Sequence, residues 1–286
     1  MKYDLSVVVV NYNGLNVLNR CVSSIYKNAG SKNVDVIVVD NNSVDESISR
    51  LLMEYPEVRV IRNKINYGFS VANNIGVEEA FAENILLLNS DAFMQVDLSI
   101  LCDIVKESKG AFIGGKMYSL DGEVRSSYGR FPEKIINILL PSSIYYDHLF
   151  NEACEVDWIE GSLLLFEKKI WEKVSGFNED IFMYGEDIEL AKRAKLLGIR
   201  SIFNPSIKYI HIGGFDEKRV GSIYRGLMHY YRSVNSPCVA LSYITFVKLV
   251  LTMKCILFFI LSRVSKNKIY NAKFSSYYES MANRNV

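Results

Sequence analysis

The run of residues 85–88, Ile-Leu-Leu-Leu, constrains the fold of this chain more than any other feature. Four consecutive large aliphatic residues predict a strand that is buried on both faces, as in the interior of a parallel sheet. The run leads directly into Asn89, Ser90 and Asp91. Ligands of open α/β sheets bind at the carboxyl ends of the strands, so Asp91 is a candidate site residue. The same three residue types also favour turns, so a strand-terminating turn is the alternative at this point.

Apolar runs of this kind alternate with helix-like segments along the first part of the chain. Strands are expected at residues 5–10, 34–39, 58–61 and 85–88, and helices at residues 15–28, 44–54, 70–82 and 98–108. This alternation predicts βαβ units, right-handed crossovers and an α/β fold in which helices flank a mostly parallel sheet.

The middle of the chain is less regular. A strand is expected at 111–117, and residues 119–155 then form a long irregular segment, of a length that is usually functional or mobile. The remaining expected elements are short strands at 156–159 and 162–166, a helix at 186–197, and extended pieces at 199–203 and 206–210. Together they predict one domain over residues 1–215.

Residues 216–286 differ from the rest of the chain in charge and hydropathy. They hold eleven Lys and Arg but three Asp and Glu, whereas the whole chain carries a net charge of only +1. This near-neutral balance argues against nucleic acid as a partner. The apolar stretch 239–261 is interrupted by Lys248 and Lys254, and its uninterrupted pieces are shorter than the ~20 residues that span a bilayer. We therefore predict a basic helical tail on an anionic membrane surface; helices packed back on the domain are the main alternative, and a true span is the third.

Cysteine use and the first residues bear on cellular location. The five cysteines are scattered and form no Cys-x-x-Cys pair, which is typical of a reducing compartment and predicts neither a disulfide framework nor a zinc site. The apolar run at 5–10 is too short for a secretory signal and follows Asp4. We expect a cytoplasmic protein, peripheral on the inner face of the plasma membrane. No residue pattern indicates its oligomeric state.

Four groups that could carry chemistry lie at the ends of expected elements: Asp40, Asp91, Asp187 and His211. Alone, each has a simpler explanation as a cap, a turn former, a first-turn acid favoured by the helix dipole, or an interior histidine. Together they supply hard-metal ligands and a separate base. The first βα turn, residues 11–14, lacks a Gly-x-Gly-x-x-Gly fingerprint, and no Gly-Lys-Ser/Thr loop occurs, so neither an NAD enzyme nor a P-loop NTPase is expected.

Six motifs, in order, resemble those of family 2 glycosyltransferases with the GT-A fold, in the bacterial rhamnosyltransferase-like branch. They are VVVVNYN at 7–13, VVDNNSVD at 38–45, NYGFSVANNIG at 66–76, LLNSD at 87–91, WIEGS at 158–162 and FMYGEDIEL at 182–190. The match covers about residues 4–215. It implies a Rossmann-like GT-A domain followed by the helical tail.

For the donor, the resemblance implies a nucleotide-sugar site. Asp40 corresponds to the acid that accepts a hydrogen bond from N3–H of a uracil or thymine ring. Asn89, Ser90 and Asp91 look like the family's Asp-x-Asp element, in which Asp91 would hold Mg²⁺ or Mn²⁺ and the ion neutralises charge on the leaving diphosphate. The departure is Asn89, which stands where the element has its first acid. Further implied site residues are His211 in the metal or phosphate shell, Asn11 and Asn13, and Asn66, Gly68 and Asn73, for which turn chemistry is the alternative.

For the acceptor, the resemblance implies that Asp187 is the general base that removes a proton from the attacking hydroxyl, with inversion at the anomeric carbon. Glu186 then positions the acceptor, while Trp158 and Gly161 shape its pocket. A place in the core is the simpler explanation for Trp158. Residues 119–155 are the expected lid. The Gln-x-x-Arg-Trp element of processive synthases is absent, which favours transfer of a single sugar.

The implied reaction is inverting transfer of one sugar from dTDP-L-rhamnose or a UDP-hexose to a lipid-linked glycan, as in O-antigen or capsule assembly at the cytoplasmic membrane face. One alternative is a sugar nucleotidylyltransferase, but residues 11–14 are not the Gly-rich, Arg-containing loop it would need. The other is a degenerate binding or scaffolding subunit without turnover. Asn89 keeps this second alternative open, while Asp91 and Asp187 argue against it.

Overall fold

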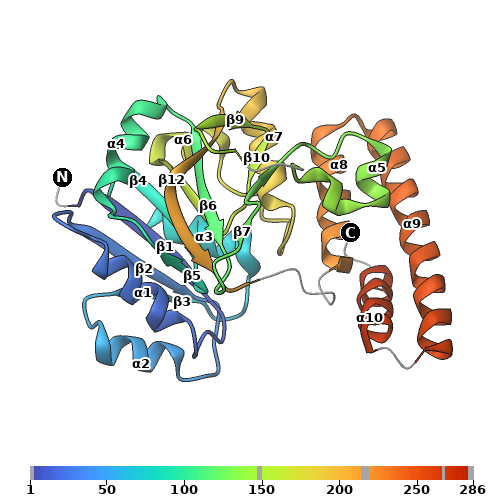
Figure 1. The fold of residues 1–286 in the computed structure, drawn as a ribbon, viewed down its shortest axis with the longest axis horizontal. Helices are drawn as coiled ribbons and strands as arrows, with labels where there is room; N and C mark the ends of the chain where they lie inside the picture. The colour runs from blue at the N-terminus through green and yellow to red at the C-terminus, as the bar shows by residue number, and fades with distance from the viewer. Residues whose placement is uncertain (1–2, 147–149, 214–219, 266–267, 283–286) are drawn as a thin grey trace.

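The computed structural model describes residues 3–146, 150–213, 220–265 and 268–282, and its body is a mixed sheet with helices on both faces (Figure 1). The strands follow the order β3-β2-β1-β4-β11-β6-β12-β5. Their bounds are β1 (Leu5–Asn11), β2 (Val34–Asp40), β3 (Arg59–Arg62), β4 (Asn84–Asn89), β5 (Ala92–Met94), β6 (Phe112–Tyr118), β11 (Leu163–Glu167) and β12 (Ser201–His211). The predicted α/β class is confirmed, because β3, β2, β1 and β4 pair in parallel and β6 pairs in parallel with β12.

Two hydrophobic layers enclose the parallel strands. The helices of the body are α1 (Leu18–Lys27), α2 (Ser47–Glu54), α3 (Gly68–Glu78), α4 (Ser99–Ser108), α6 (Lys168–Val174) and α7 (Glu186–Leu196). Val7 and Val9 belong to the layer that α1, α2 and α4 cover, and Val8 belongs to the layer of α3, α6 and α7. Successive residues of a strand point to opposite faces, so β1 is apolar on both faces because both are covered.

The second half of the sheet departs from the parallel pattern. β11 lies antiparallel between β4 and β6, and β5 lies antiparallel to the end of β12. The two extended pieces expected at 199–203 and 206–210 are one strand, β12, whose register against β6 shifts between Asn204 and Lys208, around Pro205. Neither β5 nor α6 was predicted from the sequence, because each is too short for its period to stand out.

The segment 119–155, expected to be an irregular lid, contains short regular elements. They are β7 (Val124–Arg125), β8 (Tyr128–Gly129), α5 (Ile135–Leu139), a 3₁₀ turn η1 (Pro141–Ile144) and β9 (Cys154–Val156). β8 pairs with β10 (Trp158–Ile159) in a separate two-stranded sheet. The Tyr231 hydroxyl donates to the Pro132 carbonyl at 2.5 Å, and Lys254 Nζ donates to the Leu139 carbonyl at 2.8 Å. The segment is therefore attached to the C-terminal helices.

Three helices follow the body: α8 (Val220–Val234), α9 (Pro237–Val264) and α10 (Lys268–Ala282) (Figure 1). Tyr224, Leu227 and Met228 of α8 share a hydrophobic cluster with Trp158 and with Ile188 of α7. The first helix of the tail is therefore packed on the body. The predicted domain boundary at 215/216 lies outside the described residues.

α9 is one continuous helix of 28 residues and contains both Lys248 and Lys254, which interrupt the apolar stretch of the sequence but not the helix. By length and composition alone, α9 could cross a membrane. Of its most apolar 18-residue stretch, 28 % is buried in the structure. A lysine has good helix propensity, and its long side chain can carry the charge away from apolar surface, so neither residue breaks the helix.

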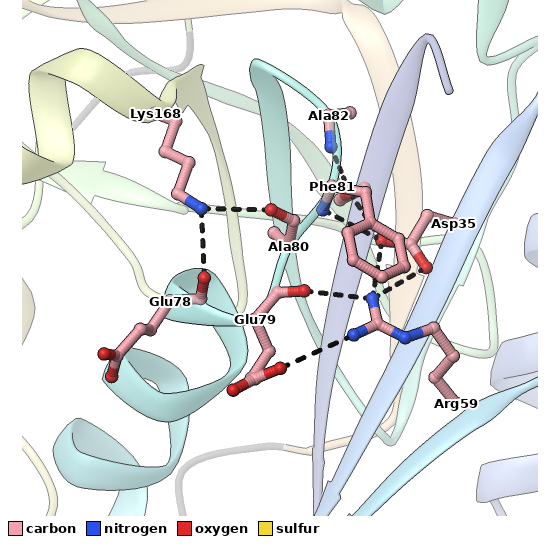
Figure 2. Close-up of polar contacts among 9 residues, drawn as sticks. Asp35, Arg59, Glu78, Glu79, Ala80, Phe81, Ala82 and Lys168 are labelled. Atoms are coloured by element: carbon pink, nitrogen blue, oxygen red, sulfur yellow. Dashed lines mark hydrogen bonds and ion pairs between the residues drawn. The ribbon is translucent and has the colours of Figure 1, made fainter. Parts of the chain in front are cut away.

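A buried carboxylate joins the outer strands to the end of α3 (Figure 2). Asp35 is 2 % exposed and accepts hydrogen bonds from Ser6 Oγ at 2.8 Å, Arg59 Nη1 at 3.1 Å and the Phe81 N–H at 3.2 Å. The Arg59 guanidinium also lies 3.7 Å from the centre of the Phe81 ring. Lys168 Nζ donates to the carbonyls of residues 78 and 80 at 3.0 Å, and cations are favourable at this end of a helix.

Arg59→Ala should lower the free energy of unfolding by about 3 kcal/mol, because it leaves the Asp35 carboxylate buried without its charge partner. Arg50→Ala is the matched control, since the side chains of its pair with Glu46 are 59 % and 70 % exposed. The control should change the free energy of unfolding by less than about 1 kcal/mol. Urea unfolding followed by circular dichroism measures both, and equal effects would contradict the role given to Asp35.

Candidate active site

Three parallel strands end at the same edge of the sheet and carry predicted site residues there. Asn11 ends β1 beside Asp40 of β2, and Asn89 ends β4 beside Val10 of β1. Parallel pairing with this register explains why residues far apart in the sequence meet at one edge. The structure thus brings together the strand-end residues that the sequence analysis singled out.

Asn11 and Asp40 are buried polar residues at this edge of the sheet. Asn11 Nδ2 lies 3.0 Å from Asp40 Oδ1, from Ser43 Oγ and from Ser47 Oγ. Asp40 is 3 % exposed, and the buried Asn11 Oδ1 has no hydrogen-bond partner. Asn13 closes the rim: its N–H donates to Ser43 Oγ at 2.9 Å, while its Oδ1 accepts from the N–H of residue 44 at 2.9 Å.

The residues of the NYGFSVANNIG motif have structural partners. Asn66 Oδ1 accepts from the Gly68 N–H at 2.9 Å, and Asn73, 2 % exposed, donates to the Phe69 carbonyl at 2.9 Å. Gly68 has φ +87°, and a Cβ there would lie 2.5 Å from the Phe182 carbonyl oxygen. These contacts agree with the turn chemistry that was the alternative for Asn66, Gly68 and Asn73. They also attach this loop to the segment just before Asp187.

Asp91 and His211 meet where β4 ends opposite the end of β12. Asp91 Oδ1 lies 3.2 Å from His211 Nε2, and Asn89 Nδ2 lies 3.4 Å from the same ring nitrogen. The Ile212 N–H donates to the Asp91 carbonyl at 3.0 Å and ties the two chain segments together. Ser90 stands between Asn89 and Asp91 in the sequence and is partly exposed.

The Asp91 and His211 groups fit as neighbouring ligands of a small divalent ion. Ligand atoms about 2.1 Å from an ion and at right angles are about 3 Å apart, close to the observed 3.2 Å. A Cβ at Gly213 would lie 2.7 Å from Asp91 Oδ2 and 2.8 Å from His211 Nε2, so the glycine keeps space open beside both. The Asn89 amide can present oxygen as well as nitrogen. Within the described residues no three His, Cys, Asp or Glu side chains form a metal site, so phosphate oxygens would have to complete the shell.

His211 lies between two carboxylates. Burial lowers the pKa of His211, but the hydrogen bond and charge of Asp91 outweigh burial and raise the pKa above its usual value. On the other side of the ring, Glu160 Oε1 lies 3.7 Å from Nδ1. Burial raises the pKa of Glu160 to about 7, against the opposing charge of His211. Sequence reasoning gave Glu160 no role, although it adjoins Gly161 in a quoted motif.

Asp187, the predicted base, lies in the first turn of α7. Its Oδ1 accepts from the Ile188 N–H at 2.8 Å, and its Oδ2 accepts from the Gly161 N–H at 3.2 Å. Burial raises the pKa of Asp187 to about 6 in spite of these hydrogen bonds. The neighbouring Glu186 is buried, its Oε2 lacks a hydrogen-bond partner, and burial together with the charge of Asp187 raises its pKa well above the usual value. Both adjacent carboxyl groups therefore favour their protonated forms more than exposed carboxyl groups do.

Trp158 does not offer a stacking surface in this structure. Its indole is 1 % exposed, packs in the cluster that contains Ile188, and donates from Nε1 to the Arg130 carbonyl at 2.9 Å. A sugar could not reach either face of the ring, so the simpler explanation, a core tryptophan, describes it. Tyr145, which sequence reasoning missed, packs edge-on against Trp158. Burial, and then the charges of Glu160 and Asp187, raise the pKa of Tyr145.

The loop before Asp187 is backed directly by α8. A Cβ at Gly226 of α8 would lie 2.2 Å from the Tyr184 carbonyl oxygen, and one at Gly185 would lie 2.8 Å from the Gly226 Cα. The two backbones can approach this closely only because both positions are glycine. The position of the base therefore depends on the first helix of the tail.

Comparison with known proteins connects this site to one family. A model described as "Glycosyl transferase family 2" matches residues 6–162. The chain is 27 % identical over 230 residues to the low-salt glycan biosynthesis hexosyltransferase Agl10 of Haloferax volcanii, covering 78 % of this chain and 71 % of the relative. It is 26 % identical over 232 residues to the N-acetylglucosaminyl-diphospho-decaprenol L-rhamnosyltransferase of Mycobacterium tuberculosis (72 % and 75 % covered). It is 25 % identical over 228 residues to the rhamnosyltransferase WbbL of Escherichia coli K12 (74 % and 84 % covered).

Solved structures share the fold at lower identity. The structure of S. aureus TarS 1-349 superposes with a TM-score of 0.57 at 15 % identity, over 98 % of this chain and 82 % of that one. GalNAc-T7, solved with UDP, GalNAc and Mn²⁺, superposes with a TM-score of 0.59 at 16 % identity, over 87 % of this chain and 54 % of that one. These likenesses confirm the predicted GT-A architecture.

Gly213→Ala should weaken binding of Mn²⁺ in the presence of UDP by about tenfold or more, because the new methyl group would fill the space beside Asp91 and His211. Isothermal titration with Mn²⁺ at saturating UDP measures the change. Binding of UDP in EDTA and the urea midpoint serve as controls and should not move. Unchanged Mn²⁺ affinity in the alanine variant would show that the ion is held elsewhere.

Proposed function

The chain belongs to glycosyl transferase family 2, and on this premise we propose that it transfers one sugar from a nucleotide-sugar to a hydroxyl group of a lipid-linked glycan. The observation that carries the proposal is that residues 160–162 contact two groups of candidate site residues, one for the donor and one for the acceptor. Glu160 lies beside His211 of the Asp91–His211 pair, and the next residue, Gly161, contacts the Asp187 carboxylate. A diphosphate leaving group and an attacking hydroxyl need such groups at separate but adjacent positions.

The donor half is built to receive a nucleoside diphosphate. Asp40 and Asn11 supply acceptors and donors for the base and ribose at the strand ends, with Asn13 at the rim. Asp91 and His211, with Asn89 and Ser90 beside them, would hold Mg²⁺ or Mn²⁺ against the two phosphates. The bound ion would stabilise the negative charge that develops on the leaving diphosphate.

The acceptor half performs the proton transfer. The Asp187 carboxylate takes the proton of the acceptor hydroxyl as that oxygen forms its bond to the anomeric carbon. The bond from that carbon to the diphosphate oxygen breaks, and the nucleoside diphosphate leaves with the electron pair. Attack from the face opposite the leaving group inverts the configuration. Gly161 holds Asp187 in place through its N–H, and burial together with the charge of Asp187 raises the pKa of the neighbouring Glu186.

Relatives support the choice of donor and acceptor within this reaction. Two of those named above are rhamnosyltransferases and one is a hexosyltransferase, so dTDP-L-rhamnose is the first donor to test and a UDP-hexose the second. The name of the mycobacterial relative includes a diphospho-decaprenol acceptor, which supports a lipid-linked acceptor here. Transfer to such an acceptor would serve O-antigen or capsule assembly. A scaffolding subunit without turnover is the second candidate function, and Asn89 is the observation that favours it.

The exposed face of α9 supports a location at the inner surface of the plasma membrane. Leu249, Met253, Ile256 and Ile260, at helical spacing on one face, are 52–62 % exposed. Lysine and arginine residues along α9 and α10 would meet anionic headgroups. A lipid-linked acceptor would then be presented to a site that stands on the same membrane.

Turnover with a panel of dTDP- and UDP-sugars and a lipid-linked acceptor tests the function. Wild-type protein should transfer sugar from one donor, and EDTA should reduce the rate strongly. Asp187→Asn should keep UDP or dTDP affinity but lose transfer by about 10²-fold or more, because the amide cannot take the proton. Absence of transfer and of donor hydrolysis with every donor would favour the scaffolding candidate.

The pH dependence of kcat/KM should report the base. Burial raises the pKa of Asp187 to about 6, so the base keeps its proton to a higher pH than an ordinary aspartate. Activity should therefore fall about tenfold per pH unit below about 6 and level off above the pKa of the groups that must be ionised. Rates at five or more pH values, with the unfolding midpoint measured at each, give the profile. Full activity retained at about pH 4.5 would exclude Asp187 as the base.

Replacing the exposed apolar residues of α9 should release the protein from vesicles. A variant with Leu249, Met253, Ile256 and Ile260 changed to Glu should lose binding to anionic phospholipid vesicles by about tenfold or more, since both apolar contact and charge attraction fall. Met53→Glu with Leu196→Glu is the matched control, because these residues are exposed on the body (84 % and 73 %). Vesicle sedimentation measures binding. Equal binding of both variants would favour a tail that only packs on the domain.

A further inference from the structure

Three consecutive residues connect the two halves of the site. Glu160 faces His211, the Gly161 N–H donates to Asp187, and the Ser162 carbonyl accepts from the Asn89 N–H at 3.0 Å. The last two contacts use the backbone, which any residue could supply. Glu160 alone acts through its side chain, and neither the donor half nor the acceptor half accounts for it.

The imidazole of His211 is held differently at its two nitrogens. Nε2 faces Asp91 at 3.2 Å, on the side where the ion and diphosphate would lie. Nδ1 is buried and has no hydrogen-bond partner among the described residues, and the Glu160 Oε1 lies 3.7 Å from it. A buried N–H without an acceptor reduces stability. The Glu160 carboxylate is close enough to become the acceptor after a small movement of either side chain.

We propose that Glu160 is a positioning residue that fixes the His211 ring, so that Nε2 points with Asp91 into the metal and diphosphate position. The proposal rests on the function proposed above. The Glu160 carboxylate accepts the Nδ1–H, which leaves the lone pair of Nε2 free to act as a ligand. A histidine that binds a metal through one ring nitrogen commonly donates a hydrogen bond from the other ring N–H to a carboxylate. Loss of that partner typically lowers metal affinity about 10–100-fold.

The surroundings of Glu160 agree with this role. Its side chain is 25 % exposed and that of His211 is 10 % exposed, so their contact is partly shielded from water. The backbone N–H of Glu160 donates to the Ser127 carbonyl at 2.8 Å, which anchors the residue independently of its carboxylate. A change of the side chain should therefore leave the path of the chain into β11 intact.

Mn²⁺ affinity at saturating UDP, measured by electron paramagnetic resonance on the full chain, tests the proposal without turnover. Glu160→Ala should weaken Mn²⁺ binding by about 10–100-fold. Glu160→Gln retains an acceptor oxygen and should lose much less. Glu167→Ala is the matched control, because Glu167 lies at the other end of β11 and its side chain is also 25 % exposed. It should bind Mn²⁺ as the wild type does.

The double variant decides whether Glu160 acts through His211. His211→Ala should weaken Mn²⁺ binding, and adding Glu160→Ala to it should cause no further loss, because the ring that Glu160 positions is gone. Wild-type affinity in Glu160→Ala, or a further loss in the double variant, would overturn the proposal. Lack of Mn²⁺ binding by the wild-type protein with UDP would overturn it too. The turnover assay would still report on sugar transfer in that case, so the two failures are distinguishable.

Discussion

The antiparallel insertion of β11 between β4 and β6 is the constraint on which the site depends. Leu163 of β11 pairs with Leu88 of β4, and Leu163, Leu164 and Leu165 are all buried, so both faces of the strand fix its register. A slip of one residue would turn each of these side chains to the other face. Because residues 160–162 lead into this strand, the same register sets their contacts with the Asp91–His211 pair and with Asp187. The geometry of the site is thus a consequence of core packing.

The loop before Asp187, the proposed base, is held from two sides. On one side the Phe69 N–H at the start of α3 donates to the Phe182 carbonyl at 2.7 Å, and Ser70 Oγ donates to the Ile181 carbonyl at 2.6 Å. On the other side α8 presses against Gly185 through Gly226. The start of α3 and the first helix of the tail therefore fix the same few residues, and these contacts give Asp187 a defined position. Positions held this closely favour a reaction that depends on orientation.

Local patterns were enough to predict the parallel half of the fold and most of the strand-end residues. β1, β2 and β4 are apolar on both faces and stop at polar residues, so Asn11, Asp40, Asn89 and Asp91 could be placed before the structure was known. The antiparallel β11, the short β5 and the role of Glu160 could not, because each depends on pairing between segments distant in sequence. Trp158 shows the same limit: its motif implied a place in the acceptor pocket, whereas the structure buries it among α7 and α8 residues, as the simpler explanation had it.

The charges of the site explain why an amide can stand at residue 89. Asp91 and Glu160 already flank His211, Asp187 contacts the neighbouring Gly161, and burial raises the pKa of Glu160 and of Asp187 toward neutrality. Another carboxylate at position 89 would add repulsion at short range and raise these values further, which would reduce the ionised fraction of the base. Asn89 keeps an oxygen that a hard ion accepts, while it adds no charge. In the proposed site an ion would then depend more on Asp91, His211 and the diphosphate, so metal and donor should bind together more strongly than either does alone.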